Sequence, residues 1–278
     1  MQAVSAWTPP TGTLGALVAA ARVRAAMLSA RGAELERRAV DRVAATAPPG
    51  FADALRRADV AVIAEVKRRS PSKGAIAPGL SAAVQATRYA DGGAAALSIL
   101  TEPERFGGDI ADLDAAGAAV TIPLLKKDFN VEPVQLLEAA AHGASAVLLI
   151  ARALPPATLI ALARDARALG LEPLVEVRDE SELEAAMRAE AVIIGVNNRN
   201  LETLEIDEAT GDRVLPRIPA SCIAVWESGV QTADDVRRAA AAGADAVLVG
   251  SSVSAAGDAS AAVRALTGIA RRRASRGA

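Results

Sequence analysis

The chain has 278 residues, of which 51% are hydrophobic, but its aromatic residues are only three Phe, two Trp and one Tyr. This length allows one large domain or two ordinary ones, and the shortage of aromatic side chains excludes a base-stacking platform for nucleic acid. The formal net charge of −2 lacks the overall positive field that nucleic-acid binding needs. We therefore expect a small-molecule ligand and no nucleic-acid partner.

Single copies of cysteine and histidine restrict the chemistry further. Cys222 is the only cysteine and His142 the only histidine, so an intramolecular disulfide, a multi-thiolate metal site and a clustered-histidine zinc site are all excluded. Acid and base chemistry then falls to Lys, Glu and Asp, and we expect no metal and a reducing, cytoplasmic setting. No apolar run approaches the ~20 residues of a membrane span, and the first ten residues lack a basic export signal. We expect a soluble protein with no membrane partner, as a monomer or weak homo-oligomer.

Residues 1–60 form a separate N-terminal segment. Helical spacing of apolar residues predicts helices over Leu14–Ser29 and Ala33–Val43. Pro48, Pro49 and Gly50 interrupt the chain before another short helix. We expect these helices to pack on the domain that follows, and residues 1–12, which lack periodicity, to be mobile.

A glycine followed by a continuous apolar run recurs after Gly93, Gly143 and Gly243, with a weaker copy from Ala189 to Gly195. This pattern is typical of a helix that ends before a strand buried on both faces. Four other apolar runs lie between or before these copies: 62–66, 123–127, 173–177 and 222–227. Eight such runs alternate with Ala-rich helical stretches, such as 134–141, 159–169, 180–188 and 232–242.

Eight strand-and-helix units predict an α/β fold, a (β/α)8 TIM barrel over residues 61–268 with the extra N-terminal helical segment. An open doubly wound sheet is the alternative, but no Gly-x-Gly-x-x-Gly follows the first strand. Residues 269–278 are predicted to be a mobile basic tail, more typical of a solvated end than of an RNA-binding segment.

The active site of such a barrel lies at the carboxyl ends of its strands, and here these ends are polar. Alternation along the first strand places Glu65 and Lys67 on one face, toward this end of the barrel. Capping or salt bridging could explain a single such residue, but not five polar strand ends. Those of the first, third, fifth, sixth and seventh strands include Glu65, Lys67, Lys127, Glu176, Asn197, Arg199, Glu227 and Ser228.

Glycines after the last two strands predict a phosphate site. Gly229, Gly250 and Ser251 leave backbone N–H groups accessible to an anion, and a short helix could begin after Gly250. The alternative is that these glycines only permit tight turns. A side chain at Gly250 is expected to obstruct the phosphate rather than the reacting centre.

Several motifs together resemble one enzyme family, indole-3-glycerol phosphate synthase, over about residues 13–265. They are 63–74 (IAEVKRRSPSKG), 97–102 (LSILTE), 106–108 (FGG), 127–129 (KDF), 175–177 (VEV), 195–201 (GVNNRNL) and 227–230 (ESGV). The resemblance includes the N-terminal helical segment. Two departures are Trp226 before Glu227 and Val134 after Pro133; strand alternation predicts that Trp226 faces the helices, not the substrate.

The resemblance implies a carboxy-lyase of tryptophan biosynthesis. Its substrate, 1-(2-carboxyphenylamino)-1-deoxyribulose 5-phosphate, closes to indole-3-glycerol phosphate with loss of CO2 and water, without a cofactor. Lys127 resembles the general acid, Lys67 and Glu65 resemble groups that hold the substrate and assist dehydration, and Glu176 resembles the carboxylate that stabilises positive charge or moves a proton. Asn197, Glu227 and Ser228 resemble orienting neighbours, while Ser70 and Arg199 fall in the matching substrate-binding motifs.

The reaction itself calls for these residue types, because a proton donor with a tuned pKa can arise where lysines and carboxylates are packed together. The anthranilate ring needs apolar walls, for which we predict Phe129, Leu149 and Leu248; Phe129 could instead be an ordinary core residue. A Schiff-base sugar-phosphate aldolase using Lys127 or Lys67, and a non-catalytic phosphate-binding barrel, are the alternative functions.

Overall fold

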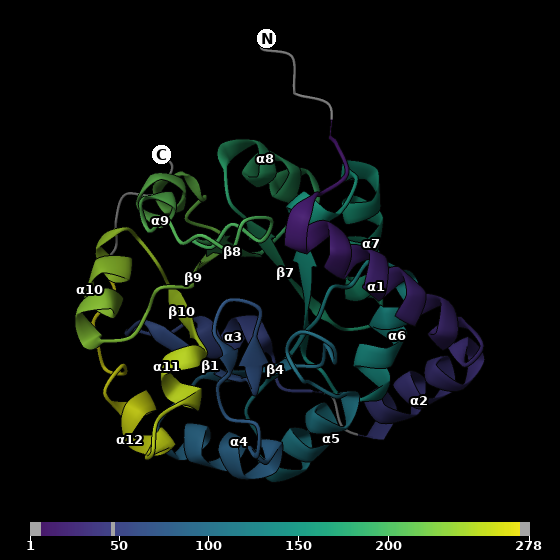
Figure 1. Ribbon diagram of the computed structural model, residues 1–278, viewed down its shortest axis with the longest axis horizontal. Coiled ribbons are helices and arrows are strands. Elements are labelled where there is room, and N and C mark those ends of the chain that lie inside the picture. Colours follow the sequence, from purple (N-terminus) through teal and green to yellow (C-terminus); the bar gives the residue numbers. More distant parts are fainter. Residues whose placement is uncertain (1–6, 46–47, 273–278) are drawn as a thin grey trace.

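The computed structural model describes residues 7–45 and 48–272, and it contains a closed barrel of eight parallel strands surrounded by helices (Figure 1). The strands pair in the order β1-β10-β9-β8-β7-β6-β5-β4. Their bounds are β1 Ala61–Val66, β4 Ala96–Leu100, β5 Leu124–Lys127, β6 Ala146–Ile150, β7 Glu172–Val177, β8 Ile193–Asn197, β9 Ile223–Glu227 and β10 Ala246–Val249. All eight predicted strands are confirmed, and the open sheet is not formed.

Helices follow the strands and return the chain to the opposite end of the barrel. They are α4 Ala82–Asp91, α5 Ile110–Ala119, α6 Pro133–Ala141, α7 Pro156–Ala168, α8 Glu180–Arg188, α9 Ala209–Val214, α10 Ala233–Ala241, α11 Ser251–Ser254 and α12 Ala259–Arg264. Side-chain oxygens of Asp109, Asp179 and Thr232 cap the starts of α5, α8 and α10 by accepting backbone N–H bonds. These local signals fix where these three helices begin.

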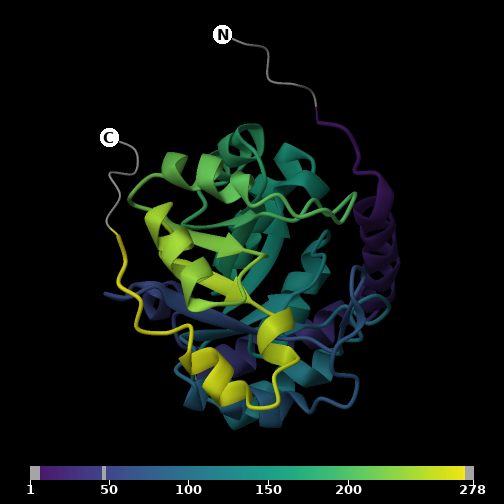
Figure 2. The ribbon, with the colours of Figure 1, turned by 60° about the vertical axis from the view of Figure 1, so that its left-hand side comes forward.

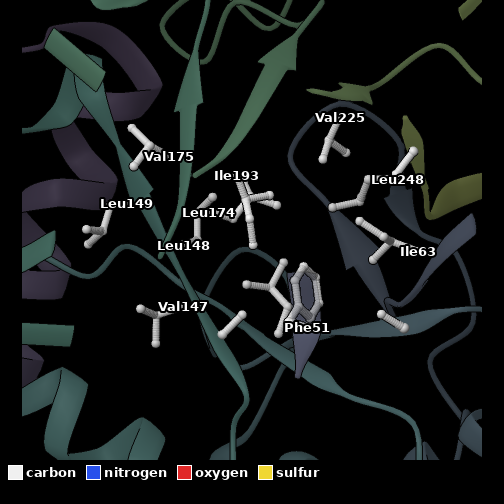
Figure 3. Close-up of a cluster of buried hydrophobic side chains, with 14 of the residues drawn as sticks. Phe51, Ile63, Val147, Leu148, Leu149, Leu174, Val175, Ile193, Val225 and Leu248 are labelled. Carbon is white, nitrogen blue, oxygen red and sulfur yellow. The ribbon is translucent and has the colours of Figure 1, made fainter. Parts of the chain in front are cut away.

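Alternate strand residues fill the interior of the barrel, as Figure 3 shows for Ile63, Leu148, Leu174, Ile193 and Leu248. The residues between them face the helices, and both sets are buried, which explains the continuous apolar runs of the sequence. Leu149 and Val175 lie together on the other side of β6 and β7 from Leu148 and Leu174 (Figure 3). This alternation decides which strand residues can reach the site.

The N-terminal segment forms α1 Gly12–Ser29, α2 Gly32–Ala45 and α3 Phe51–Leu55. Helix α1 lies along one side of the barrel (Figure 2), and α2 packs on α6. Phe51 is fully buried, and its backbone N–H donates to the carboxylate of Glu172 at the start of β7 over 2.8 Å. In the described residues, this segment therefore contacts the barrel and its helices.

The loop after β1 contains a small hairpin that the sequence did not indicate. Strand β2 Arg69–Ser70 pairs antiparallel with β3 Gly74–Ala75. The guanidinium of Arg68 anchors the base of this loop, because it binds Asp112 and donates to the carbonyl oxygens of Leu80 and Gly107. Other short elements without a sequence signal are η1 Ala151–Ala153, η2 Leu215–Arg217 and α9.

Segments near both ends of the described chain contact the barrel. Val60 N–H donates to Ile269 O over 2.8 Å, Asp59 pairs with Ala270, and Arg271 binds Asp245, so residues 269–271, predicted to belong to a mobile tail, make specific contacts with the segments before β1 and β10. Trp7 is likewise held, through a bond from its indole N–H to Arg152 O. Of the other predicted mobile residues, Thr8 accepts from Arg152, Thr11 donates to Glu202 and Gly12 begins a helix, whereas 1–6 and 273–278 lie outside the described residues.

Within the described part of the chain, no single helix has the length and apolar composition of a membrane span. Helices α1 and α2 reach that composition only when taken together, and an 84° bend separates them.

Candidate active site

The carboxyl ends of the strands surround one cavity, which we call the mouth cavity. Fourteen of the fifteen residues predicted for the site line it: Glu65, Lys67, Ser70, Lys127, Phe129, Glu176, Asn197, Arg199, Glu227, Ser228, Gly229, Leu248, Gly250 and Ser251. They come from the ends of six strands, β1, β5, β7, β8, β9 and β10, and from the loops that follow them, so residues from Glu65 to Ser251 are brought together. The predicted convergence of polar strand ends is therefore confirmed as a geometric fact.

Leu149 is the exception, and its prediction as a substrate wall is wrong. Strand alternation turns its side chain toward the helices, whereas its neighbours Leu148 and Ile150 line the cavity. Five consecutive apolar residues, 146–150, give no polar marker from which the inward face could be identified.

Lys127 lies at the centre of the mouth cavity, between two carboxylates. Its Nζ is 2.6 Å from Glu227 Oε2 and 3.4 Å from Glu176 Oε2. Burial by itself lowers the pKa of Lys127, but the negative charges of Glu227, Glu176 and Glu65 outweigh it, so the pKa lies above the ordinary lysine value. Lys127 is therefore held in its protonated, proton-donating form.

Glu227 is buried on β9 and carries a perturbed pKa. Burial and the nearby charge of Glu176 raise the pKa of Glu227, while Lys127 opposes the shift. Its Oε2 binds Lys127, and its Oε1 has no hydrogen-bond partner among the described residues. That oxygen points at the α-carbon of Gly195 on β8, where a Cβ atom would overlap with it. Gly195 thus provides the space that Glu227 occupies.

A chain of hydrogen bonds joins three of the strand ends. Asn197 Nδ2 donates to Glu176 Oε1 over 3.0 Å, and Ser228 Oγ donates to Asn197 Oδ1 over 2.9 Å. Ser228 has a φ of +66°, a backbone conformation that non-glycine residues rarely adopt, and its carbonyl oxygen accepts from Asn198 and Trp226. Such strain at a strand end is typical of a functional turn.

Glu65 and Lys67 form a second charged pair at the edge of the mouth cavity, 2.5 Å apart. Their predicted common face is confirmed. Gly250 lies directly against them: a Cβ atom there would overlap with Glu65 Oε1 and come within 2.7 Å of Lys67 Nζ. The position therefore adjoins both the proposed phosphate turn and this pair, which argues against the expectation that a side chain at Gly250 would spare the reacting centre.

Apolar residues cover one side of the mouth cavity. Phe129 is 7% exposed and its ring centroid lies 6.3 Å from that of Phe106. Leu17 of α1, Leu100, Leu148 and Ile150 also belong to this side, whereas Leu248 of β10 lines the cavity from the strand opposite β6. Phe129 is thus both well buried and part of the cavity, so its two alternative interpretations are compatible. Leu17 and Phe106 were missed because helical periodicity marks them only as apolar.

The N-terminal segment reaches the site through Arg24 of α1. Its guanidinium binds Asp128 Oδ1 at 2.8 Å and lies 3.5 Å from Glu102. Asp128 directly follows Lys127 and also accepts from Thr101 Oγ1 over 3.0 Å. Sequence analysis assigned no role to Arg24, since nothing local relates it to a residue 104 positions away.

Arg199 lies between the mouth cavity and a smaller adjoining one, and it lines both. Its guanidinium donates to Leu204 O over 2.7 Å. The smaller cavity also contains Glu182, whose pKa is raised to about 7 by burial and by the charge of Asp179. Ser70 lies on the hairpin after β1, where its hydroxyl accepts from the backbone N–H of Lys73.

A family model described as indole-3-glycerol phosphate synthase matches residues 17–266. The chain belongs to this family. A protein of Streptomyces coelicolor named indole-3-glycerol phosphate synthase 1 is 55% identical over 200 residues, covering 72% of this chain and 74% of that protein. A relative from Parafrankia sp. (strain EAN1pec), named indole-3-glycerol phosphate synthase, is 52% identical over 204 residues, covering 73% and 76%.

Solved structures support the fold alone. A 3-hexulose-6-phosphate synthase aligns with a TM-score of 0.59 at 15% identity, covering 74% of this synthase-family chain and 98% of that one. Thiamine phosphate pyrophosphorylase from Pyrococcus furiosus aligns with a TM-score of 0.57 at 16% identity, covering 76% and 95%. The (β/α)8 barrel is thereby confirmed by comparison as well as by its own topology.

Trp226 packs on the helix-facing side of the barrel, as predicted. It is 2% exposed and lies against α9, where a Cβ atom at Gly211 would come within 2.5 Å of its ring. Arg238 of α10 lies over the ring, 5.7 Å from its centroid. Trp226 therefore packs between strand and helices, and its indole N–H also donates to the carbonyl oxygen of Ser228, which lines the mouth cavity.

Proposed function

We propose that the mouth cavity carries out the reaction of the family, closure of 1-(2-carboxyphenylamino)-1-deoxyribulose 5-phosphate to indole-3-glycerol phosphate with loss of CO2 and water. The observation that carries this proposal is the position of Lys127 between Glu227 and Glu176, beside an apolar side formed by Phe129. A cation facing apolar surface suits a reaction that protonates a ketone oxygen next to an aromatic ring.

Lys127 is the proposed general acid. Its raised pKa keeps the ammonium group charged, so that it can donate a proton to the substrate carbonyl oxygen as the new carbon–carbon bond forms. Loss of CO2 from the anthranilate carbon follows. Glu176, which also accepts from Asn197, stabilises the positive charge that develops on the substrate or accepts the proton lost when the ring becomes aromatic.

Lys67 and Glu65 are proposed to hold the substrate and to assist the dehydration step, with the Lys67 ammonium group binding the carboxylate of the substrate. Both line the same cavity as Lys127 but bind each other, so the cavity holds two separate charged groups. Asn197 and Ser228 orient Glu176 through their hydrogen bonds, and Ser70 and Arg199 contact the substrate from the surrounding loops.

The phosphate group is proposed to bind the backbone N–H groups of Gly229, Gly250 and Ser251. All three residues line the same cavity as Lys127, which fits one substrate that extends from the phosphate turn to the apolar side. Gly229 has a φ of +91°, so its backbone conformation also favours glycine. The tight-turn interpretation and the phosphate interpretation are therefore compatible at Gly229.

The Schiff-base alternative requires a neutral amine, and Lys127 is held protonated by its carboxylates. A non-catalytic barrel would have no need of four buried or half-buried charged groups facing one another. We further propose a cytoplasmic monomer or weak homo-oligomer that needs no metal or cofactor. These last points remain predictions.

The test is to add the carboxyphenylamino-deoxyribulose phosphate to the purified chain, without added metal, and to follow indole fluorescence and CO2 release together. We expect both to appear at equal rates. After treatment with borohydride in the presence of substrate, and removal of both by dialysis, the enzyme should retain its activity toward fresh substrate; irreversible inactivation with a mass increase on Lys127 or Lys67 would support the aldolase instead. Absence of both products would contradict the proposed function.

A further inference from the structure

The end of β1 carries a buried polar cluster that takes no part in the chemistry described above. The carbonyl oxygen of Glu65 accepts from Ser254 Oγ over 2.9 Å and lies 3.2 Å from the hydroxyl of Tyr89. The two hydroxyl groups lie 3.1 Å apart. Tyr89 belongs to α4 and Ser254 to α11, so three separate elements meet at this carbonyl.

The cluster occupies a place where the strand ladder has stopped. Pairing between β1 and β10 ends with Ala64 opposite Val249, because the chain turns into α11 after Gly250. Ala61 N–H donates to Asp245 O on the β10 side, and backbone groups alternate along a parallel strand, so the carbonyl of Glu65 also faces that side. The two hydroxyls replace the missing strand partner of a buried carbonyl.

The distances indicate which hydroxyl group donates to which oxygen. Two protons serve three oxygen-to-oxygen contacts, and the shortest contact assigns the Ser254 proton to the Glu65 carbonyl. Tyr89 then donates to Ser254 or directly to the carbonyl. Burial raises the pKa of Tyr89 to about 12, which keeps its proton in place. Either hydroxyl can therefore partly replace the other.

Glu65 and Ser254, which this cluster joins, both lie close to groups of the proposed site. Glu65 and Lys67 stand at the end of β1, and Gly250, in contact with that pair, begins the turn into α11 that ends with Ser254. We propose that Tyr89 and Ser254 are positioning residues, which fix the phosphate turn 250–251 relative to Glu65 and Lys67. This inference rests on the proposed function. It explains how the binding of a remote phosphate can align the reacting end of the substrate.

The experiment is a double-mutant cycle with Tyr89→Phe, Ser254→Ala and both together. Each single variant should lower kcat/KM by about threefold and the double variant by about thirtyfold or more, since each hydroxyl supports the carbonyl that the other has lost. The inhibition constant for inorganic phosphate should rise in parallel. Ser145→Ala is the control. Ser145 lies just before β6, and its buried hydroxyl accepts from the backbone N–H of Leu124, so its loss should change stability only.

A second readout does not depend on turnover. Tyr89 is the only tyrosine, so 3-fluorotyrosine gives the folded wild-type protein a single fluorine resonance. We expect inorganic phosphate to shift it, and Ser254→Ala to abolish that shift. This inference would be overturned if the wild-type enzyme closes the ring, the double variant has the same kcat/KM and the same phosphate inhibition constant, and the fluorine resonance does not shift when phosphate is added. An inactive wild-type protein would instead contradict the proposed function.

Discussion

Glu227 Oε1 occupies the space that a side chain at Gly195 would need, on the neighbouring strand of the barrel. The other oxygen of the same carboxylate lies 2.6 Å from Lys127 Nζ. A glycine two residues before Asn197 therefore allows the central ion pair of the site to form. Its role cannot be recognised locally, since Gly195 and Glu227 are brought together only by the pairing of β8 with β9.

Gly195→Ala should lower kcat by at least about tenfold, because the added methyl group forces Glu227 away from Lys127 and removes a charge-assisted hydrogen bond. Steady-state kinetics with circular dichroism will measure the loss and verify the fold. Gly257→Ala is the matched control, since nothing lies within 4 Å of a Cβ atom there. Equal kcat for the two variants would show that the position of Glu227 is unimportant.

Gly250→Ala should reduce kcat as well as raise KM, because the new Cβ atom meets Glu65 and Lys67. We expect each parameter to change by about tenfold. Ring-closure kinetics at several substrate concentrations separate the two effects. A rise in KM with unchanged kcat would mean that the position affects phosphate binding only.

Inorganic phosphate or sulfate should inhibit competitively by binding the backbone N–H groups of Gly229, Gly250 and Ser251. Inhibition kinetics and a crystal soaked in sulfate test this prediction from independent directions. Density for the anion elsewhere in the cavity, with none at this turn, would count against the phosphate assignment.

The pH dependence of kcat/KM should be bell-shaped. Activity falls on the acid side as a required carboxylate gains a proton, and the raised pKa of Glu227 moves this limb above the ordinary glutamate value. It falls on the alkaline side as Lys127 loses its proton, and the raised pKa of Lys127 moves that limb above the ordinary lysine value. Both limbs belong to the coupled cluster rather than to single residues.

His142→Gln should leave both limbs of this profile in place. His142 caps the end of α6, before β6, and its Nδ1 lies 2.8 Å from Asp114 Oδ2, away from the mouth cavity. A pH–rate profile of the variant makes the comparison. Disappearance of either limb would show that an imidazole takes part in the reaction.

The sequence predicted most of the site because the barrel topology is strict. Once eight buried strands are recognised, every carboxyl end must meet the others, so the polar ends at Glu65, Lys127 and Glu176 identify the mouth cavity. Alternation then placed Lys67 correctly, because polar residues mark which face of β1 is inward. In β6, which is apolar throughout, no polar residue marks the inward face, so Leu149 was assigned to the wrong face.

The remaining features depend on contacts between distant segments. Arg24 reaches Asp128 only after α1 has packed along the barrel, and Tyr89 reaches Ser254 only after α4 and α11 have met at the end of β1. The placement of segment 269–271 similarly depends on pairing with residues 59–60. Such contacts carry no local periodicity or turn signal.

The most direct test of the proposed mechanism is the turnover of Lys127→Met, a side chain of similar length that cannot donate a proton. We predict that kcat for indole-3-glycerol phosphate formation falls by at least ~100-fold, with only a modest change in the dissociation constant of the substrate, as expected for the loss of a general acid. Turnover close to that of the wild-type enzyme would contradict the assignment of Lys127 as the proton donor at the centre of the site.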